Sequence, residues 1–126
     1  MRYHYSQTYH PPAPTIEVSF ISIAEMNHTP KLSALVDTGA DATIVPMEYL
    51  EDIKAPFVRE MAIRTQWGET HPVSLYMVDV QIDEIILPSI DVVGDEWTDE
   101  VILGRDILNR LQILLDGPKK VIEISV

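Results

Sequence analysis

At 126 residues, 46% of them hydrophobic, the chain is long enough for one globular domain with a modest core. Nine Lys and Arg residues against 20 Asp and Glu residues give a formal net charge of −11, so the chain should repel phosphate backbones, which excludes nucleic acid as a partner. The absence of cysteine excludes a disulfide framework, a thiolate nucleophile and a cysteine-based zinc site.

No segment of the sequence is predicted to enter a membrane. No apolar run approaches the roughly 18 residues that a transmembrane helix needs. The amino end shows no charged segment followed by an apolar core and a small-residue cleavage site, because residues 1–5 give way to the proline-rich residues 10–14. We therefore expect a soluble, cytoplasmic protein without a membrane partner.

The chain divides into two regions of different pattern. Residues 1–14 contain three of the nine prolines and show no sustained period, which predicts a flexible N-terminal arm. Residues 15–126 are patterned as a folded domain, which begins with a strand at residues 15–23, where apolar and polar side chains alternate. A hairpin loop should connect it to a returning strand at residues 32–36, which ends at Asp37.

Asp37 lies where a carboxylate is energetically costly. Leu35 and Val36 before it suit a buried strand, and Gly39 after it supplies the backbone freedom of a tight loop. Burial of a carboxylate costs free energy unless it has a partner, and ionisable groups with perturbed titration gather at functional sites. We interpret this loop as a candidate active site; the alternative is that Asp37 only begins an Asx-turn.

Short strands and turns alternate through the rest of the chain, at intervals of roughly 8 to 12 residues. Trp67 and Gly68 lie between two strand-like segments, which predicts a long β-hairpin with glycine in its turn. The predicted fold class is therefore all-β, a closed or partly open β-barrel with one or two short helices. In chain order, further strands are expected at residues 43–45, 57–66, 70–82, 85–93 (two short strands around a proline), 101–103, 113–115 and 121–126, and helices at 46–51 and 105–111.

Two motifs resemble those of the retropepsin-like aspartic proteases. Leu35-Val36-Asp37-Thr38-Gly39-Ala40 fits the family's apolar-apolar-Asp-Thr/Ser-Gly-Ala signature at every position. Residues 101–108, Val-Ile-Leu-Gly-Arg-Asp-Ile-Leu, look like its second motif, in which apolar residues lead to Gly, Arg, Asp or Asn and a short helix. Gly104 follows Asp37 by 67 positions, similar to the family's spacing. The resemblance spans roughly residues 15–126 and implies a barrel of the single-lobe acid protease type.

The resemblance implies catalytic roles for Asp37, Thr38 and Gly39. Peptide hydrolysis by carboxylates needs two of them about a water molecule, one to activate the water and a protonated one to polarise the carbonyl. The chain has no second Asp-Thr/Ser-Gly, so the second carboxylate should be Asp37 of another copy in a symmetric homodimer. Thr38 would hydrogen-bond across to the partner's loop, and Gly39 would let the two loops approach. No cofactor or metal is expected, because the four histidines show no metal-ligand spacing.

The resemblance also implies an ion pair between Asp41 and Arg105, buried beneath the catalytic loop and supported by Gly104. Each of the two could instead be an exposed charge that contributes little to stability.

The predicted hairpin corresponds to the family's flap, which closes over bound peptide. Trp67 would cover the substrate, or would pack on its own hairpin. Retroviral flap tips carry several glycines, whereas this one has only Gly68, and retroviral members weave both chain ends into a dimer sheet, whereas here mainly residues 121–126 are left for the interface. The residues expected to contact substrate are Ala40, Asp41, Gln66, Trp67 and Gly68.

Two functional hypotheses follow. The first is a dimeric aspartic endopeptidase that cuts extended polypeptide, held as an added strand between the cleft floor and the flap. The alternative is a non-catalytic peptide-binding or dimerisation module of the same fold. A β-barrel that binds small ligands would leave the motifs at Asp37 and Gly104 unexplained.

Overall fold

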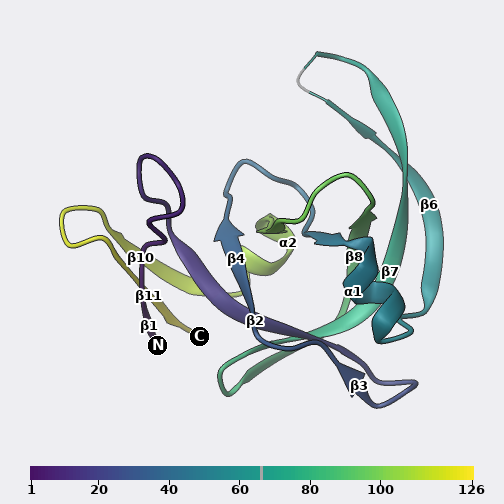
Figure 1. Cartoon of the computed structure of the whole chain (residues 1–126), viewed down its shortest axis with the longest axis horizontal. Coiled ribbons are helices and arrows are strands. Elements are labelled where there is room, and N and C mark those ends of the chain that lie inside the picture. The colour runs from purple at the N-terminus through teal and green to yellow at the C-terminus, as the bar shows by residue number, and fades with distance from the viewer. Residues whose placement is uncertain (66) are drawn as a thin grey trace.

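Strands form the body of the protein, and two short helices, α1 and α2, lie among the elements described (Figure 1). The computed structural model describes residues 1–65 and 67–126. The strands are β1 (Arg2–His4), β2 (Thr15–Ser22), β3 (Asn27–His28), β4 (Leu32–Val36), β5 (Ile44–Pro46), β6 (Phe57–Arg64), β7 (Thr70–Ile82), β8 (Ile85–Asp95), β9 (Val101–Leu103), β10 (Gln112–Asp116) and β11 (Val121–Ser125), and the helices are α1 (Met47–Asp52) and α2 (Arg105–Leu108).

Strand β2 closes the barrel because its two halves pair with different strands. Its first half is antiparallel to β4, and its second half is antiparallel to β7. From β4 the ladder continues through β9, β5 and β8 and returns to β7. Because β4 and β9 are parallel, with Val36 opposite Leu103, their carboxyl ends lie side by side. Asp37 and Gly104, each the next residue along, are therefore brought together, and the predicted all-β barrel is confirmed.

The alternating pattern of β2 fills the interior of the barrel. Ile16, Val18 and Phe20 are each at most 1% exposed, while Glu17 between them points to solvent. Ile107 and Leu108 of α2 belong to the same buried cluster, which attaches the helix to the barrel. Burial of these apolar side chains supplies most of the stabilisation that holds the barrel closed.

Part of the predicted N-terminal arm forms a strand and makes side-chain hydrogen bonds. Residues 2–4 form β1, which is antiparallel to β11. The Tyr3 hydroxyl donates a hydrogen bond to Asp83 Oδ2 at 2.8 Å, and burial together with this bond raises the pKa of Tyr3. The Tyr9 hydroxyl donates to Glu100 Oε1 at 2.6 Å, a bond that raises the pKa of Tyr9 to about 12. The sequence pattern did not predict β1, because three residues are too few to display a period.

A single strand, β8, replaces the two short strands expected around Pro88. The register between β7 and β8 shifts between Val78 and Val80, which places Asp79 opposite Pro88 and Ser89. Ser89 has a positive φ of 56°, and its N–H donates to Asp79 Oδ1 at 2.9 Å. The proline is thus accommodated in a β-bulge, where it has no ladder hydrogen bond to donate. The second helix is also shorter than predicted, ending at Leu108.

Replacement of Phe20 by alanine should lower the free energy of unfolding by about 3–5 kcal/mol, because the side chain is fully buried and the barrel cannot close over the cavity left behind. The measurement is urea denaturation followed by circular dichroism. Ile23→Ala is the control, since Ile23 is 57% exposed and its loss should change stability little. Equal effects of the two substitutions would contradict this assignment of the core.

Candidate active site

The loop after β4 holds Asp37 by backbone and side-chain hydrogen bonds. The Asp37 N–H donates to the Leu103 carbonyl at 3.1 Å, which attaches the start of the loop to β9. Its carboxylate Oδ1 accepts the Gly39 N–H at 2.9 Å, and its backbone carbonyl accepts the Ala40 N–H at 3.2 Å. This is the Asx-turn considered as an alternative, and it is compatible with a catalytic role because it orients one carboxylate oxygen.

The tip of the loop is open to solvent. Asp37 is half-buried, while Thr38 and Gly39 are exposed. Within residues 1–65 and 67–126, no hydrogen bond to the second carboxylate oxygen, Oδ2, is formed. The loop therefore presents a carboxylate that is oriented on one side and available on the other.

Gly104 lets the base of the loop approach the start of α2. A Cβ at this position would lie 2.6 Å from both the carbonyl carbon and the carbonyl oxygen of Ala42, and 2.9 Å from the Ala40 oxygen. No side chain fits at these distances from backbone atoms. The Arg105 N–H donates to the same Ala40 oxygen at 2.8 Å, so α2 is joined directly to the loop.

Thr43 and Asp106 connect the far end of the loop to α2, a contact that the sequence analysis did not predict. Thr43 is fully buried; its hydroxyl donates to Asp106 Oδ1 at 2.8 Å, and its N–H donates to Asp106 Oδ2 at 3.2 Å. The same hydroxyl accepts the Gly104 N–H at 3.1 Å. These bonds satisfy the buried polar groups of Thr43. The one sequence feature that could have predicted this contact is Asp106 itself, which directly follows Gly-Arg in the second motif.

Asp41 and Arg105 form the expected ion pair, but the expectation that it is buried is wrong. The Arg105 guanidinium contacts Asp41 Oδ1, and the two side chains are 44% and 88% exposed respectively. Arg105 Nη1 also donates to the Thr38 carbonyl at 2.8 Å. The pair lies on the surface rather than beneath the loop. Its contribution to stability is therefore small.

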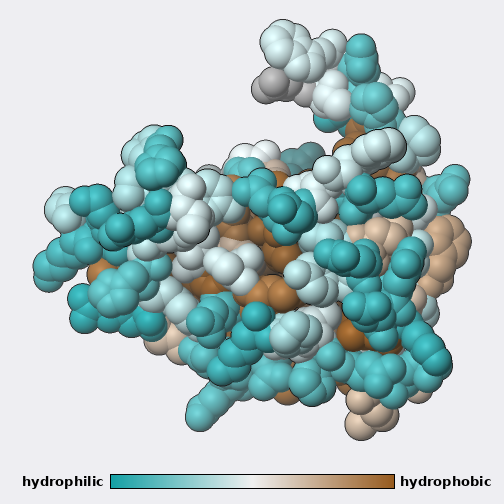
Figure 2. All heavy atoms as spheres, viewed as in Figure 1, coloured by the Kyte–Doolittle hydropathy of each residue, from teal (hydrophilic) through white to brown (hydrophobic). Residues whose placement is uncertain are grey.

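The predicted hairpin is present as β6 and β7, which pair as far as Arg64 and Thr70. Gly68 in the turn has a positive φ of 82°, a conformation that favours glycine. Trp67 is 81% exposed, so it does not pack on its own hairpin. The other predicted tip residue, Gln66, lies outside the described residues. Figure 2 shows the end of the hairpin standing apart from the body of the molecule.

A hollow of about 530 Å³ lies between this hairpin and the part of the barrel that follows the Asp37 loop. Ile44 and Met47 line one side of it, and Ile63 and Val73 of the hairpin line the other. Gly94 lines it as well, and a Cβ there would lie 2.7 Å from the Met47 methyl carbon. The sequence analysis missed this group, because its members are far apart along the chain. The signal in the sequence was Trp97, an aromatic residue among acids that is 94% exposed at the rim.

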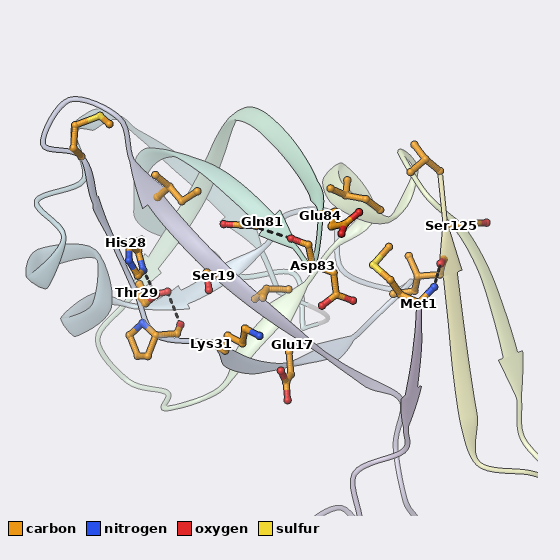
Figure 3. Close-up of a pocket in the computed structure, with 17 residues that line it drawn as sticks. Met1, Glu17, Ser19, His28, Thr29, Lys31, Gln81, Asp83, Glu84 and Ser125 are labelled. Atoms are coloured by element: carbon orange, nitrogen blue, oxygen red, sulfur yellow. Dashed lines mark hydrogen bonds between the residues drawn. The ribbon is translucent and has the colours of Figure 1, made fainter.

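A larger hollow of about 1,100 Å³ crosses the outer face of β2 (Figure 3). Glu17, Ser19, Lys31 and Asp83 are among the side chains that line it, and none of its lining residues belongs to the Asp37 loop or to α2. It is therefore separate from the candidate active site.

Metal and membrane sites were also considered. Across residues 1–65 and 67–126, no group of three or more His, Asp or Glu side chains is arranged to hold a metal ion. The helices in this same part of the chain are too short and too polar to cross a membrane.

Comparison with known proteins identifies the family. The family model described as gag-polyprotein putative aspartyl protease matches residues 23–110, which is more than half of the chain and contains both motifs. The chain belongs to this family. No curated protein sequence matches it. The family match ends before β10 and does not include β1 or β11.

Solved structures of retropepsin-like proteases share the fold. A retropepsin-like aspartic protease from Rickettsia conorii aligns with a TM-score of 0.64 at 16% identity, covering 100% of this chain and 92% of its own. The EIAV protease, complexed with the inhibitor HBY-793, aligns with a TM-score of 0.57 at 22% identity, covering 78% and 86%. The simian foamy virus (mac) protease aligns with a TM-score of 0.53 at 23% identity, covering 76% and 92%. At these identities the similarity establishes the retropepsin-like fold.

Asp106→Ala should destabilise the protein by about 1–3 kcal/mol, because it removes both acceptors from the buried Thr43. Asp41→Ala should cost less than about 1 kcal/mol, because the ion pair that it breaks is exposed. Both are measured by urea denaturation at one fixed protein concentration. Asp106→Asn, which keeps one acceptor, should fall between them. A larger loss for Asp41→Ala than for Asp106→Ala would contradict the roles assigned here.

Proposed function

We propose that the protein is an aspartic endopeptidase that acts as a homodimer, with Asp37 of each copy supplying one half of a catalytic dyad. The observation that carries this proposal is the state of Asp37: one oxygen is held by the Gly39 N–H, and the side chain is half-buried at the exposed tip of the family's signature loop. A carboxylate that is held in position by one oxygen, with its other oxygen available, is suited to accept or donate a proton.

A second copy is required because the neighbouring carboxylates of the same chain are already engaged. Asp41 is bonded to Arg105, and Asp106 is bonded to Thr43. Neither can serve as the second acid without losing its structural contact. The exposed loop tip at Thr38 and Gly39 is free to face an identical loop across a two-fold axis.

The dyad would work as a coupled acid and base. Two carboxylates in close contact cannot both ionise, so they share one proton. The ionised carboxylate removes a proton from water while the oxygen of that water attacks the peptide carbonyl carbon, and the protonated carboxyl group gives its proton to the carbonyl oxygen. In the collapse of the tetrahedral intermediate, one hydroxyl group gives its proton to the carboxylate that is now ionised, and the C–N bond breaks as the leaving amine takes up the proton held by the other carboxyl group.

The polypeptide substrate would lie between the Asp37 loop and the β6–β7 hairpin, which acts as the flap. The hollow of about 530 Å³ beneath the hairpin is large enough for a substrate side chain. Its wall of Ile44, Met47 and Val73 favours an apolar contact with that side chain. Trp67 at the hairpin tip is exposed and would cover the bound chain when the flap closes.

Asp37→Asn should abolish cleavage of an unfolded protein substrate while leaving the fold intact, because it removes the ionisable group and preserves its size. The wild type should show a bell-shaped dependence of kcat/KM on pH between about pH 3 and 8, since the singly protonated dyad exists only between its two titration steps. Asp52→Asn, which changes an exposed carboxylate at the end of α1, is the matched control and should retain activity.

Cleavage by Asp37→Asn at the wild-type rate would refute the protease assignment. Peptide binding without cleavage by the wild type would favour the non-catalytic binding module instead.

Specific activity should fall on dilution, because each chain carries half of the dyad. The measurement compares turnover per chain with the oligomeric state from analytical ultracentrifugation over the same concentration range. Both should change together around the dissociation constant of the dimer. Hydrolysis through Asp37 by a protein that is fully monomeric would contradict the dyad.

A further inference from the structure

An exposed tryptophan lies among acidic residues at the rim of the hollow of about 530 Å³. Residues 95–100, Asp-Glu-Trp-Thr-Asp-Glu, lead from the end of β8 to β9. The first three of them, Asp95, Glu96 and Trp97, line the hollow. Trp97 is 94% exposed, so its indole ring is free to contact whatever enters there.

Hydrogen bonds within this segment and to the N-terminal residues fix the backbone on both sides of Trp97. The Trp97 N–H donates to Asp95 Oδ1 at 2.9 Å. The Glu100 N–H donates to the Thr98 hydroxyl at 3.1 Å, and Glu100 Oε1 accepts the hydrogen bond from the Tyr9 hydroxyl. Trp97 is therefore presented at the rim by a backbone that is already ordered.

The charge of the lining is negative. Within residues 1–65 and 67–126, neither Asp95 nor Glu96 forms an ion pair, and none of the residues that line the hollow is Lys or Arg. His71 also lines it, and its Nε2 lies 3.5 Å from Glu69 Oε2, so a proton on His71 would be balanced by that carboxylate. A cation in the hollow would thus meet two unpaired carboxylates.

The walls of the hollow are apolar, in contrast to its rim. Ile44, Met47, Val73 and Val93 all contribute to them. A long basic side chain suits this combination, because its methylene groups can lie against apolar walls while its charged end stays at a polar rim. There the cation would contact the face of Trp97 and the neighbouring carboxylates.

We propose that this hollow selects an arginine or lysine side chain of the substrate, at one fixed position near the scissile bond, an inference that rests on the proposed endopeptidase. Arginine is favoured over lysine, because its planar guanidinium stacks on an aromatic face and hydrogen-bonds to carboxylates at the same time. An acidic side chain would be repelled by Asp95 and Glu96. An apolar one would fill the walls but leave the rim without a partner.

The cleavage profile of the full chain gives the first test. The wild type is incubated at about pH 6, where ordinary carboxylates are ionised, with an unfolded protein, and the cleaved bonds are mapped by mass spectrometry. Arginine and lysine should be enriched at a single position relative to the bond that is cut. Asp37→Asn, purified in the same way, should give no cleavage, which excludes a contaminating protease.

A pair of synthetic peptides then measures the preference. Both carry one cleaved sequence, with arginine or methionine at the enriched position. The wild type should have a kcat/KM for the arginine peptide about tenfold above that for the methionine peptide. The variant Asp95→Asn/Glu96→Gln should lose this ratio while cleaving the methionine peptide at the wild-type rate, and Asp95→Asn keeps an acceptor for the Trp97 N–H. Trp97→Leu, which keeps an apolar side chain without the indole face, should lower the ratio about threefold.

The matched control is Asp52→Asn/Asp99→Asn. It removes the same net charge as Asp95→Asn/Glu96→Gln, from two exposed carboxylates that do not line the hollow. The preference for arginine should survive in this control, because the interaction depends on the place of the charges and not on the net charge of the chain. Circular dichroism checks that every variant is folded.

A binding measurement separates this inference from the proposed function. Random octapeptides are captured on the full Asp37→Asn chain and sequenced, with and without Asp95→Asn/Glu96→Gln. An active wild type with no enrichment of basic residues, or a preference that Asp95→Asn/Glu96→Gln and the control lose equally, would overturn the inference while leaving the endopeptidase intact. Capture of basic peptides that depends on Asp95 and Glu96, by a chain whose wild type cleaves nothing, would support the hollow as a site for a basic side chain and refute the enzyme.

Discussion

The geometry of the candidate site depends on the close approach of the Asp37 loop to Gly104. The Ala42 carbonyl group occupies the space where any other residue at position 104 would carry its Cβ. This contact allows the Gly104 N–H to reach the Thr43 hydroxyl and the Arg105 N–H to reach the Ala40 carbonyl. Because β4 and β9 are parallel neighbours, the Asp37 loop and Gly104 begin side by side at the carboxyl ends of these two strands. The contact between Gly104 and the Ala42 backbone then joins the two motifs.

The base and the tip of the loop differ in how completely their polar groups are satisfied. At the base, the buried Thr43 has its N–H and hydroxyl paired with Asp106. At the tip, Thr38 and Gly39 are exposed, and Asp37 is held through one oxygen. Internal bonds therefore position the base rigidly, which lets the tip remain open to a partner or a substrate without loss of its geometry. The proposed dimer uses this division, since it requires identical, preformed tips to meet.

The terminal sheet, formed by β1, β11 and β10, ties both ends of the chain to the barrel. The β1–β11 pairing anchors the chain ends within one copy, and the buried Ile122 and Ile124 tie this sheet to the common core. The β10 edge is left apolar and unpaired among the described residues, which is costly for a monomer in water.

Local patterning in the sequence determined the elements whose burial is one-sided or whose turns need glycine, namely the alternating strand β2 and the β6–β7 hairpin around Gly68. The two motifs around Asp37 and Gly104 were also recognisable in the sequence alone. Only the tertiary structure decided which groups lie beneath the loop. It placed Asp106 against the buried Thr43 and left the pair of Asp41 and Arg105 on the surface. The tertiary structure also showed that residues 2–4 form a strand and that β8 continues without a break through Pro88. The partner of a strand or of a bulge lies far away in the sequence, so periodicity within one segment cannot predict the pairing.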